Sequence, residues 1–425
     1  MTTEPKTDSL PGSWHQSELG KVAKWGSGGT PKANNSAYYG GNIPWAIIGD
    51  LNDGIITETA NSITQLGLDE SSSKLVPKGT LLIAMYGSIG KLGIAGVDLA
   101  TNQAIAFATP LINVATHKFL FHYLASQKEV FLASGKGMTQ QNISQTMLKT
   151  WPIPLPPVAE QEKIVEILEE QLSRLNVALA SVRLVREKAA QFRRSLLHAA
   201  FTGALSNQNV TTGSLPDTWS DIPLVEVATF KNGYAYKSLD WLDEGVSVIK
   251  IANVGNGEVT LDDCSHISHE LANQTAEFKV EYGDFLIALS GVTLGNCGVY
   301  RHSEISRMNQ RVARIRLKPD CGVIEKILEY YFESPAAFKS IWSAAKGAAQ
   351  PNISTKSMEQ FRIPLAPIKE QQKLVEILDE QFSRLSSSMS IADTIENKAN
   401  ALRRSLLHAA FNGNLTKEWR EGAHV

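Results

Sequence analysis

Three short stretches hold residue types that could do chemistry, and each fails a test of spacing or of residue type. Gly87-Ser-Ile-Gly-Lys91 has the glycines and the lysine of a phosphate loop, but it is too short, and Leu92 stands where a hydroxyl residue should be. Cys264-Ser-His-Ile-Ser-His269 lacks the fourth ligand and the spacing of a zinc site. A loop that methylates an amine needs Asn or Asp, then Pro-Pro, then an aromatic residue, whereas Val158 follows the only Pro-Pro. We therefore expect no catalytic residue, metal or cofactor here, and we interpret 87–91 as a strand turn.

A long internal repeat is the strongest signal in the sequence. RRSLLHAAF stands at 193–201 and again at 403–411, an offset of 210 residues. At the same offset, PPVAEQEKIVEILEEQLSRL (156–175) matches APIKEQQKLVEILDEQFSRL (366–385). The repeat spans roughly 138–205 and 348–415, so it indicates two large units and not an array of short repeats.

Each copy of the repeat predicts a long helix, with prolines at its start and Gly203 or Gly413 after its end. About 42 residues make a helix of roughly 60 Å. Apolar residues recur every three or four positions as in a coiled coil, and Arg186 and Arg193 interrupt them. In the first copy these residues are Val165, Leu168, Leu172, Leu175, Leu179, Val182, Ala189, Leu196 and Ala200. We expect the two helices to pair with each other, antiparallel; the alternative is pairing between two copies of the chain.

A compact region of mixed character precedes each helix. Apolar runs predict strands at 45–48, 81–84, 246–251, 285–289 and 311–317, and helices at 118–134 and 324–338. The two regions share short matching sequences, such as Asn102-Gln103 and Asn309-Gln310. The residues that lie between these matches differ almost everywhere. The predicted fold class is α+β: two mixed α/β heads joined by two long antiparallel helices in a pseudo-twofold coiled-coil pair. The predicted boundaries are 1–155 and 206–365 for the heads, 156–205 and 366–415 for the helices, and 416–425 for a tail.

Composition indicates an ordinary globular protein, with 43% hydrophobic and 20% charged residues. The sequence shows neither an apolar run typical of a signal peptide nor one long enough to cross a membrane. Three cysteines without a CxxC pair favour a reducing cytoplasm. The net charge of −2 does not point to nucleic acid, but 286–362 holds eleven Lys and Arg against six Asp and Glu, which is compatible with a basic face.

The layout resembles the specificity subunit of Type I restriction-modification enzymes over about 10–415. The doubled Asn-Ile-Ser, Ile-Pro-Leu, Glu-Gln and long helix carry the resemblance most strongly. Further matching stretches are Gly28-Gly-Thr-Pro31, Tyr38-Tyr-Gly-Gly-Asn-Ile-Pro-Trp45, Gly79-Thr-Leu-Leu-Ile-Ala84 and Tyr86-Gly-Ser-Ile-Gly90. The second head departs from the pattern, with Lys231-Asn-Gly-Tyr-Ala-Tyr236 in place of Gly-Gly-Thr-Pro.

The resemblance implies a DNA-reading scaffold without catalysis of its own. Each head would be a target recognition domain that reads one half of an asymmetric bipartite site in double-stranded DNA. The helices would set the spacer between the half-sites and dock two modification subunits, which methylate adenine with S-adenosylmethionine. Restriction subunits that translocate DNA, with ATP and Mg²⁺, would add cleavage. One turn of B-DNA is about 34 Å, so helices of the predicted length suit half-sites about a turn apart.

Three groups of residues in each head are candidate DNA contacts. The first is a glycine loop, whose glycines could let backbone N–H groups approach phosphate. The second is the Asn-Gln pair, because Asn and Gln can pair with adenine and Arg with guanine. The third is the glycine-rich stretch before each repeated helix, where Asn142 and Asn352 are interpreted as caps. The candidates are Ser27, Thr30, Lys32, Tyr38, Asn102, Gln103, Lys136 and Gln140 in the first head, and Lys231, Asn232, Tyr234, Tyr236, Lys237, Asn309, Gln310, Arg311, Lys346 and Gln350 in the second.

Each candidate has a plainer interpretation. The glycine loops could be ordinary polar turns, the Asn-Gln pairs could bond backbone, and Tyr38 and Tyr39 could pack in a loop instead of stacking on a flipped base. Arg193-Arg194 and Arg403-Arg404 could pair with acids of the facing helix, meet a modification subunit or lie in solvent. For the whole chain, the alternatives to DNA reading are a coiled-coil adaptor that binds protein and an unrecognised enzyme that binds a nucleotide.

Overall fold

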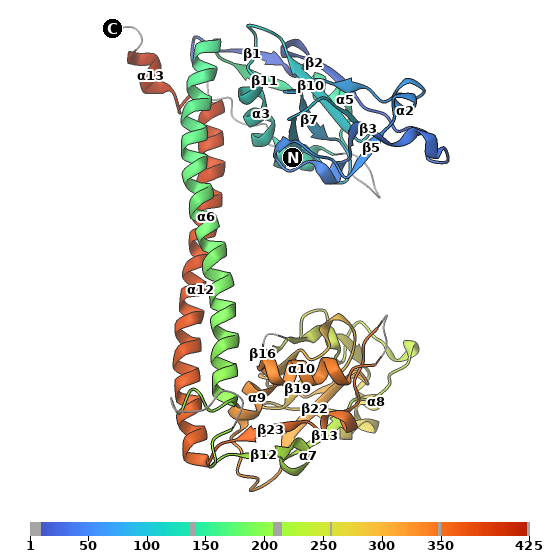
Figure 1. Ribbon diagram of the computed structural model, residues 1–425, viewed down its shortest axis with the longest axis vertical. Coiled ribbons are helices and arrows are strands. Elements are labelled where there is room, and N and C mark those ends of the chain that lie inside the picture. Colours follow the sequence, from blue (N-terminus) through green and yellow to red (C-terminus); the bar gives the residue numbers. More distant parts are fainter. Residues whose placement is uncertain (1–9, 136–141, 207–214, 256, 347–349, 423–425) are drawn as a thin grey trace. The chain divides into compact units, whose positions relative to one another are not determined.

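The computed structural model describes residues 10–135, 142–206, 215–255, 257–346 and 350–422. The chain divides into two compact units: unit 1 comprises residues 1–182 and 394–425, and unit 2 comprises residues 183–393. Each unit holds a head of strands and short helices together with parts of two long helices, α6 (Val158–Phe201) and α12 (Ile368–Phe411) (Figure 1). Because both boundaries fall inside these helices, each helix contributes to both units.

The head of unit 1 contains two main sheets and a short two-stranded one. The five-stranded sheet has the order β2 (Ala23–Ser27), β10 (Ile105–Pro110), β7 (Leu81–Ala84), β8 (Leu92–Ala95) and β4 (Gly54–Ile56). The four-stranded sheet has the order β5 (Asn61–Ile63), β3 (Tyr39–Ala46), β9 (Leu99–Thr101) and β6 (Leu75–Val76). The short sheet pairs β1 (His15–Glu18) with β11 (Pro152–Leu155). The helices are α1 (Leu19–Val22), α2 (Gln65–Asp69), α3 (His117–Ser126), α4 (Lys128–Ser134) and α5 (Gln145–Lys149), and α13 (Lys417–Gly422) follows α12.

The head of unit 2 repeats this strand order with one extra strand. Its larger sheet runs β13 (Ala228–Asn232), β22 (Val312–Leu317), β19 (Phe285–Ala288), β20 (Cys297–Val299), β16 (Gly257–Val259) and β15 (Val254–Gly255). Its second sheet runs β17 (Ser265–Ile267), β14 (Val246–Ile249), β21 (Ser306–Met308) and β18 (Lys279–Val280), and β12 (Ser220–Pro223) pairs with β23 (Arg362–Leu365). The helices are α7 (Leu224–Val227), α8 (His269–Gln274), α9 (Glu325–Glu333), α10 (Pro335–Ala344) and α11 (Thr355–Met358). The same order in both heads confirms two heads of one mixed α/β fold.

The long helices are antiparallel in each unit, as the sequence predicts. Unit 1 takes the first part of α6 and the last part of α12, and Glu160 accepts a 2.7 Å hydrogen bond there from Thr416. Unit 2 takes the opposite parts, and Arg186 forms a 2.6 Å ion pair with Asp393. The seam residues Leu168, Leu172, Val182, Leu378, Phe382 and Ala392 are buried. Antiparallel pairing therefore covers the apolar seam of each helix, the environment that its heptad pattern requires.

The repeated Glu-Gln pair fixes each head to its long helix. Gln161 is fully buried, and its Nε2 donates to the carbonyls of Val114 and Pro156 at 2.9 and 3.0 Å, while its Oε1 accepts from the Thr116 amide at 2.9 Å. Gln371 makes the same three bonds in unit 2, to Gly322, Ala366 and Ile324. These bonds satisfy backbone groups that would otherwise be buried without a partner, and each such group would cost about 1–3 kcal/mol.

Two of the predicted helices are each broken into two. The stretch 324–338 forms α9 and α10, because Ser334 caps α10 through the Ala337 amide and Pro335 occupies the first helical turn. Proline disfavours helical geometry at the residue before it, so the chain cannot run through as one helix. The stretch 118–134 likewise divides into α3 and α4 at Gln127.

The repeated Asn-Ile-Ser has a different local role from the one predicted. The caps of α5 and α11 are Ser144 and Ser354, whose hydroxyls accept from the amides of Met147 and Ser357 at 3.1 Å. The asparagines form β-bridges instead, Asn142 with Tyr86 and Asn352 with Ser290. The isoleucines between them are buried. The motif therefore joins a loop of the larger sheet to the start of a short helix.

Candidate DNA interface

The first two predicted groups of unit 1 lie side by side at one end of the larger sheet. The glycine loop after β2 bonds to the Asn-Gln turn before β10: the Gly29 amide donates to the Thr101 carbonyl at 2.9 Å, and Gly28 to Ile105 at 3.2 Å. The Thr30 hydroxyl donates to the Gln103 side chain. Two groups that stand about 70 residues apart in the sequence therefore share one surface.

The third group continues the same edge. The Met85 amide, just after β7, donates to the Ala104 carbonyl at 2.8 Å, and the Ile143 amide donates to Met85 at 3.0 Å. Tyr86, which is 39% exposed, bridges Asn142 beside them. The candidates Lys136 and Gln140 lie outside the described residues. We call this row, made of 27–32, 101–105, 84–86 and 142–143, the unit 1 edge.

Unit 2 has the same row of backbone hydrogen bonds. The Tyr234 amide donates to Met308 at 2.9 Å, and the Gln310 amide donates back to Tyr234 at 2.8 Å. The Leu289 amide then donates to Arg311 at 2.8 Å, and the Ile353 amide to Leu289 at 3.0 Å. Lys346 joins the row through a β-bridge with Asn352. The unit 2 edge is therefore 231–234, 308–312, 289–290, 346 and 350–353.

The glycines of these loops allow close packing within the protein. A Cβ atom on Gly28 would lie 2.0 Å from the Thr101 carbonyl oxygen, and one on Gly233 would lie 2.2 Å from that of Asn309. The amides of Gly28, Gly29 and Gly233 already donate to carbonyls of the neighbouring strand turn. Our interpretation that these glycines bring N–H groups to phosphate is therefore wrong, because those donors are already in use.

The candidates differ in how free their side chains are. Asn102 and Asn309 are half-buried, and each uses its side-chain oxygen to accept a backbone amide two residues ahead, at 3.1 and 3.4 Å. They hold the turn, which was the plainer interpretation. Ser27 is half-buried, and Lys231 pairs with Glu277 at 2.6 Å. The exposed candidates are Thr30, Lys32 and Gln103 in unit 1, and Asn232, Tyr234, Lys237, Gln310, Arg311, Lys346 and Gln350 in unit 2.

Two predicted aromatic contacts are covered by protein. Tyr38 is 6% exposed and its hydroxyl donates to Glu70 at 2.5 Å, while Tyr236 is 8% exposed and bonds Thr275 at 3.1 Å. A base cannot stack on a ring that the protein already covers. The structure therefore contradicts the prediction that Tyr38 and Tyr236 contact DNA. Tyr86 of the unit 1 edge is 39% exposed, and Val292, which follows Gly291 beside the unit 2 edge, is fully exposed. The sequence could have pointed to them, since both follow the matching strands 81–84 and 285–288.

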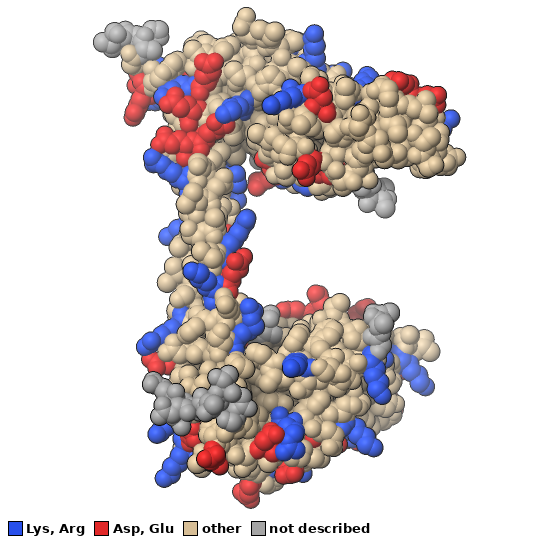
Figure 2. All heavy atoms as spheres, viewed as in Figure 1, with Lys and Arg blue, Asp and Glu red and all other residues tan. Residues whose placement is uncertain are grey.

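Part of the basic surplus in 286–362 is used inside the protein. Arg307 is buried and donates to the carbonyls of Ala272 and Ser306, and burial lowers its pKa. Arg316 bonds Asp284 at 2.6 Å, which raises the pKa of the guanidinium, and Arg314 lies 3.7 Å from the same carboxylate. Figure 2 shows Lys and Arg scattered among Asp and Glu over the face in view. Exposed basic residues remain at the edge itself, in Arg311 and Lys346.

No group of three or more His, Cys, Asp and Glu in the described ranges is placed to hold a metal ion. His266 lies on β17 and His269 on α8, and residues 87–91 form the turn between β7 and β8, with positive φ at Gly87 and Gly90. None of the described helices is both long and apolar enough to cross a membrane.

Two heads of one mixed α/β fold, each with a polar edge and each fixed to a paired long helix, define a two-headed recognition protein. The model of the family "Type I restriction modification DNA specificity domain" matches residues 11–180 and 216–397. The chain therefore belongs to this family.

Relatives of the whole chain agree with this assignment. The EcoBI specificity subunit of Escherichia coli is 24% identical, over 92% of this chain and 79% of that protein. The MjaVIII specificity subunit of Methanocaldococcus jannaschii is 21% identical, over 94% and 93%. Both carry the name of a Type I restriction enzyme specificity subunit.

Solved structures share the fold. One, described as the structural basis of complex assembly and conformational transition of the type I R-M system, has a TM-score of 0.68 at 20% identity and covers 96% of this chain and 99% of its own. The HsdS subunit from Thermoanaerobacter tengcongensis has a TM-score of 0.50 at 18% identity, with the same coverage. The two-headed fold predicted from the sequence is therefore confirmed.

Proposed function

We propose that this chain is the DNA specificity subunit of a Type I restriction-modification complex, and that each head reads one half of an asymmetric bipartite site through its edge. The observation that carries the proposal is that the two edges share one backbone frame and differ in side chains. Both edges expose an equivalent glutamine, Gln103 and Gln310, while the exposed Arg311 of unit 2 stands where unit 1 has Ala104. Base edges are read by such amide and guanidinium groups, while the backbone frame sets their positions.

We further propose that the chain has no catalysis of its own and acts in the cytoplasm with partner subunits. Two modification subunits would bring S-adenosylmethionine, and restriction subunits would bring ATP, Mg²⁺ and translocation. Each unit carries one equivalent exposed apolar pair on its long helices, which supports a count of two. The pair is Ile395 and Leu402 on α12 in unit 1, and Val185 and Phe192 on α6 in unit 2, at the repeat offset of 210 residues.

The test is a map of methylated adenine in a host that expresses the chain with its modification subunits. We expect one asymmetric two-part sequence. Replacing Gln103 by Ala should relax only one half of it, and replacing Gln310 by Ala only the other half. Gln16 is exposed on β1 away from the edge, so Gln16→Ala should change neither half. Absence of a sequence preference, or relaxation of both halves by one substitution, would reject the proposal.

A further inference from the structure

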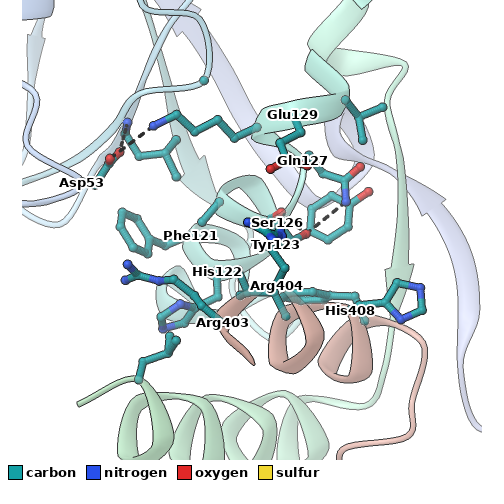
Figure 3. A pocket seen from close by; sticks show the side chains of 18 of the residues that line it. Asp53, Phe121, His122, Tyr123, Ser126, Gln127, Glu129, Arg403, Arg404 and His408 are labelled. Carbon is teal, nitrogen blue, oxygen red and sulfur yellow. Dashed lines mark hydrogen bonds and ion pairs between the residues drawn. The ribbon is translucent and has the colours of Figure 1, made fainter. Parts of the chain in front are cut away.

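Unit 1 contains a groove between its head and its long helices. The groove has a volume of about 920 Å³ and is lined by α3, α4, the first part of α6 and the last part of α12. Arg403, Arg404 and His408 of α12 line one side, and Phe121, His122 and Ala125 of α3 line another. Figure 3 shows the Arg403 side chain pointing toward Phe121 and His122. Nothing in the proposed DNA reading uses this groove.

The internal repeat supplies a comparison for this groove, because Arg403 of unit 1 corresponds to Arg193 of unit 2. In unit 2, Arg193 forms an ion pair with Glu333 of α9, and its guanidinium lies 3.9 Å from the centre of the Phe382 ring. The arginine of this motif is thus held by a carboxylate from one side and an aromatic ring from the other. Both attractions are physically expected for a guanidinium.

Both of these partners are replaced in unit 1. The hydroxyls of Tyr123 and Tyr331 bond equivalent carbonyls, those of Pro152 and Arg362, which fixes the correspondence of α3 with α9. Two residues further on, Ala125 therefore stands where unit 2 has Glu333. On α6, Leu172 stands where α12 has Phe382, at the repeat offset. Ala125 and Leu172 both line the groove, so the groove occupies the space that the carboxylate side chain and the ring fill in unit 2.

The positive charges of Arg403 and Arg404 in the groove are not neutralised by a nearby carboxylate in the described part of this chain. Among the described residues, the side chains of Arg403 and Arg404 have no hydrogen bond or ion pair. Of the acids that line the groove, Glu169 pairs with Lys118 at 2.7 Å and Asp53 with Lys128 at 3.5 Å, and Glu129 is exposed at the end of the lining where α4 begins. A guanidinium beside apolar and aromatic side chains favours a carboxylate partner.

We propose that the groove binds an acidic segment of a protein subunit that assembles with this chain, and that a carboxylate of that segment meets Arg403 in the place that Glu333 takes at Arg193. The inference goes beyond the proposed DNA reading. It makes the two units unequal: in unit 2 the chain supplies the carboxylate itself, and in unit 1 the partner supplies it. Phe121, Leu172 and Leu407 add apolar surface to the lining, which would accept an apolar side chain next to the carboxylate.

The test measures assembly of the full chain with its modification and restriction subunits, by titration of each purified subunit. Arg403→Ala should weaken one subunit's affinity about ten-fold, because a charged pair at an interface loses its partner. Ala125→Glu should have the same effect, because it copies the arrangement of unit 2 and gives Arg403 an internal carboxylate. Arg194→Ala is the matched control, an exposed arginine of the same repeated motif, and should leave the affinity unchanged. The methylated sequence should stay the same in all three variants, which separates this test from that of the DNA reading.

A second measurement identifies the occupant. A photo-crosslinking amino acid at Ser173, an exposed residue that lines the groove, should attach in the assembled complex to a stretch of another subunit that contains Asp or Glu. Attachment to residues 1–9 of this chain or to a second copy of it would overturn the proposal, and so would a stretch without acidic residues or no attachment at all. Unchanged affinity in both Arg403→Ala and Ala125→Glu would overturn it as well.

Discussion

At the scale of single residues, the two edges separate half-buried side chains that hold a turn from exposed side chains that can meet DNA. Asn102 and Asn309 give their oxygens to the backbone, so the residues that follow them are better placed to read bases. Gln103 is exposed in unit 1, and Gln310 and Arg311 are exposed in unit 2. Gln103 and Gln310 stand at equivalent positions and are alike, but Arg311 stands where unit 1 has Ala104, so the two edges offer different chemistry, as reading two different half-sites requires.

Arg311 is the residue of unit 2 best suited to contact guanine. Arg311→Ala should relax the sequence preference at one base position and cost about 1–3 kcal/mol there. Selection of bound sequences from a random DNA pool measures this. The control is Arg301→Ala, because Arg301 is equally exposed but follows β20 at the opposite end of the sheet. An even loss of affinity across all sequences, with a shallower dependence on salt, would instead make Arg311 a phosphate contact.

The sequence could locate these edges, but it could not show which of their side chains are exposed and which are buried or paired within the protein. The Asn-Gln pairs and glycine loops stand out because both heads repeat them, and the structure places them together. Burial of Tyr38 and Tyr236 depends on Glu70 and Thr275, which are distant in sequence. The basic segment 286–362 does not include Glu281 and Asp284, which neutralise Arg316. The composition of the nearby sequence does not show which residue of a neighbouring strand a side chain will pair with.

At the scale of elements, the long helices have two apolar faces with different roles. The first is the seam, where Leu168, Leu172, Leu378 and Phe382 are buried. The second holds the four residues Val185, Phe192, Ile395 and Leu402, between 42% and 50% exposed. A heptad pattern predicts the seam, but it does not predict a second apolar face, which costs free energy in water unless another molecule covers it.

If this second face docks the modification subunits, substitutions can remove its apolar side chains in one unit and leave those of the other unit intact. Replacing Ile395 and Leu402 by Ser should remove one modification subunit, and replacing Val185 and Phe192 by Ser should remove the other. Native mass spectrometry of the complex would report two, one or no bound subunits. Leu66→Ser is the control, since Leu66 is 46% exposed on α2, which packs against β3 and β5. If the variant with all four serine substitutions still binds two modification subunits, these subunits dock at another surface.

At the scale of the whole molecule, the duplication produces two units that each use both long helices. Neither head packs only on the helix that follows it, because unit 1 needs 394–425 and unit 2 needs the second part of α6. Phe411 of α12, for example, packs edge-on against Phe119 and Tyr123 of the first head. The sequence predicted the helix pair, but the crossing of unit boundaries follows from antiparallel pairing and is not visible in a repeat offset.

The proposed role of the helices as a spacer predicts what happens when both are lengthened. Duplicating 179–185 and 389–395 together adds one heptad to each helix, about 10 Å at about 1.5 Å per residue. The unread spacer of the methylated sequence should grow by about three base pairs at about 3.4 Å each, with both half-sites unchanged. Lengthening one helix alone shifts the seam and should abolish methylation. A spacer that stays constant in the double variant would mean that the helices do not set it.

The crossing of unit boundaries has a consequence for synthesis on the ribosome. All segments of unit 2 have been made once residue 393 has been added, but unit 1 still lacks its second helix. Until the final segment emerges, Val165, Leu168 and Leu172 have no α12 to cover them. The head that is translated first is therefore completed last, and a chain truncated near residue 393 would carry all segments of unit 2 together with an uncovered apolar stripe in unit 1.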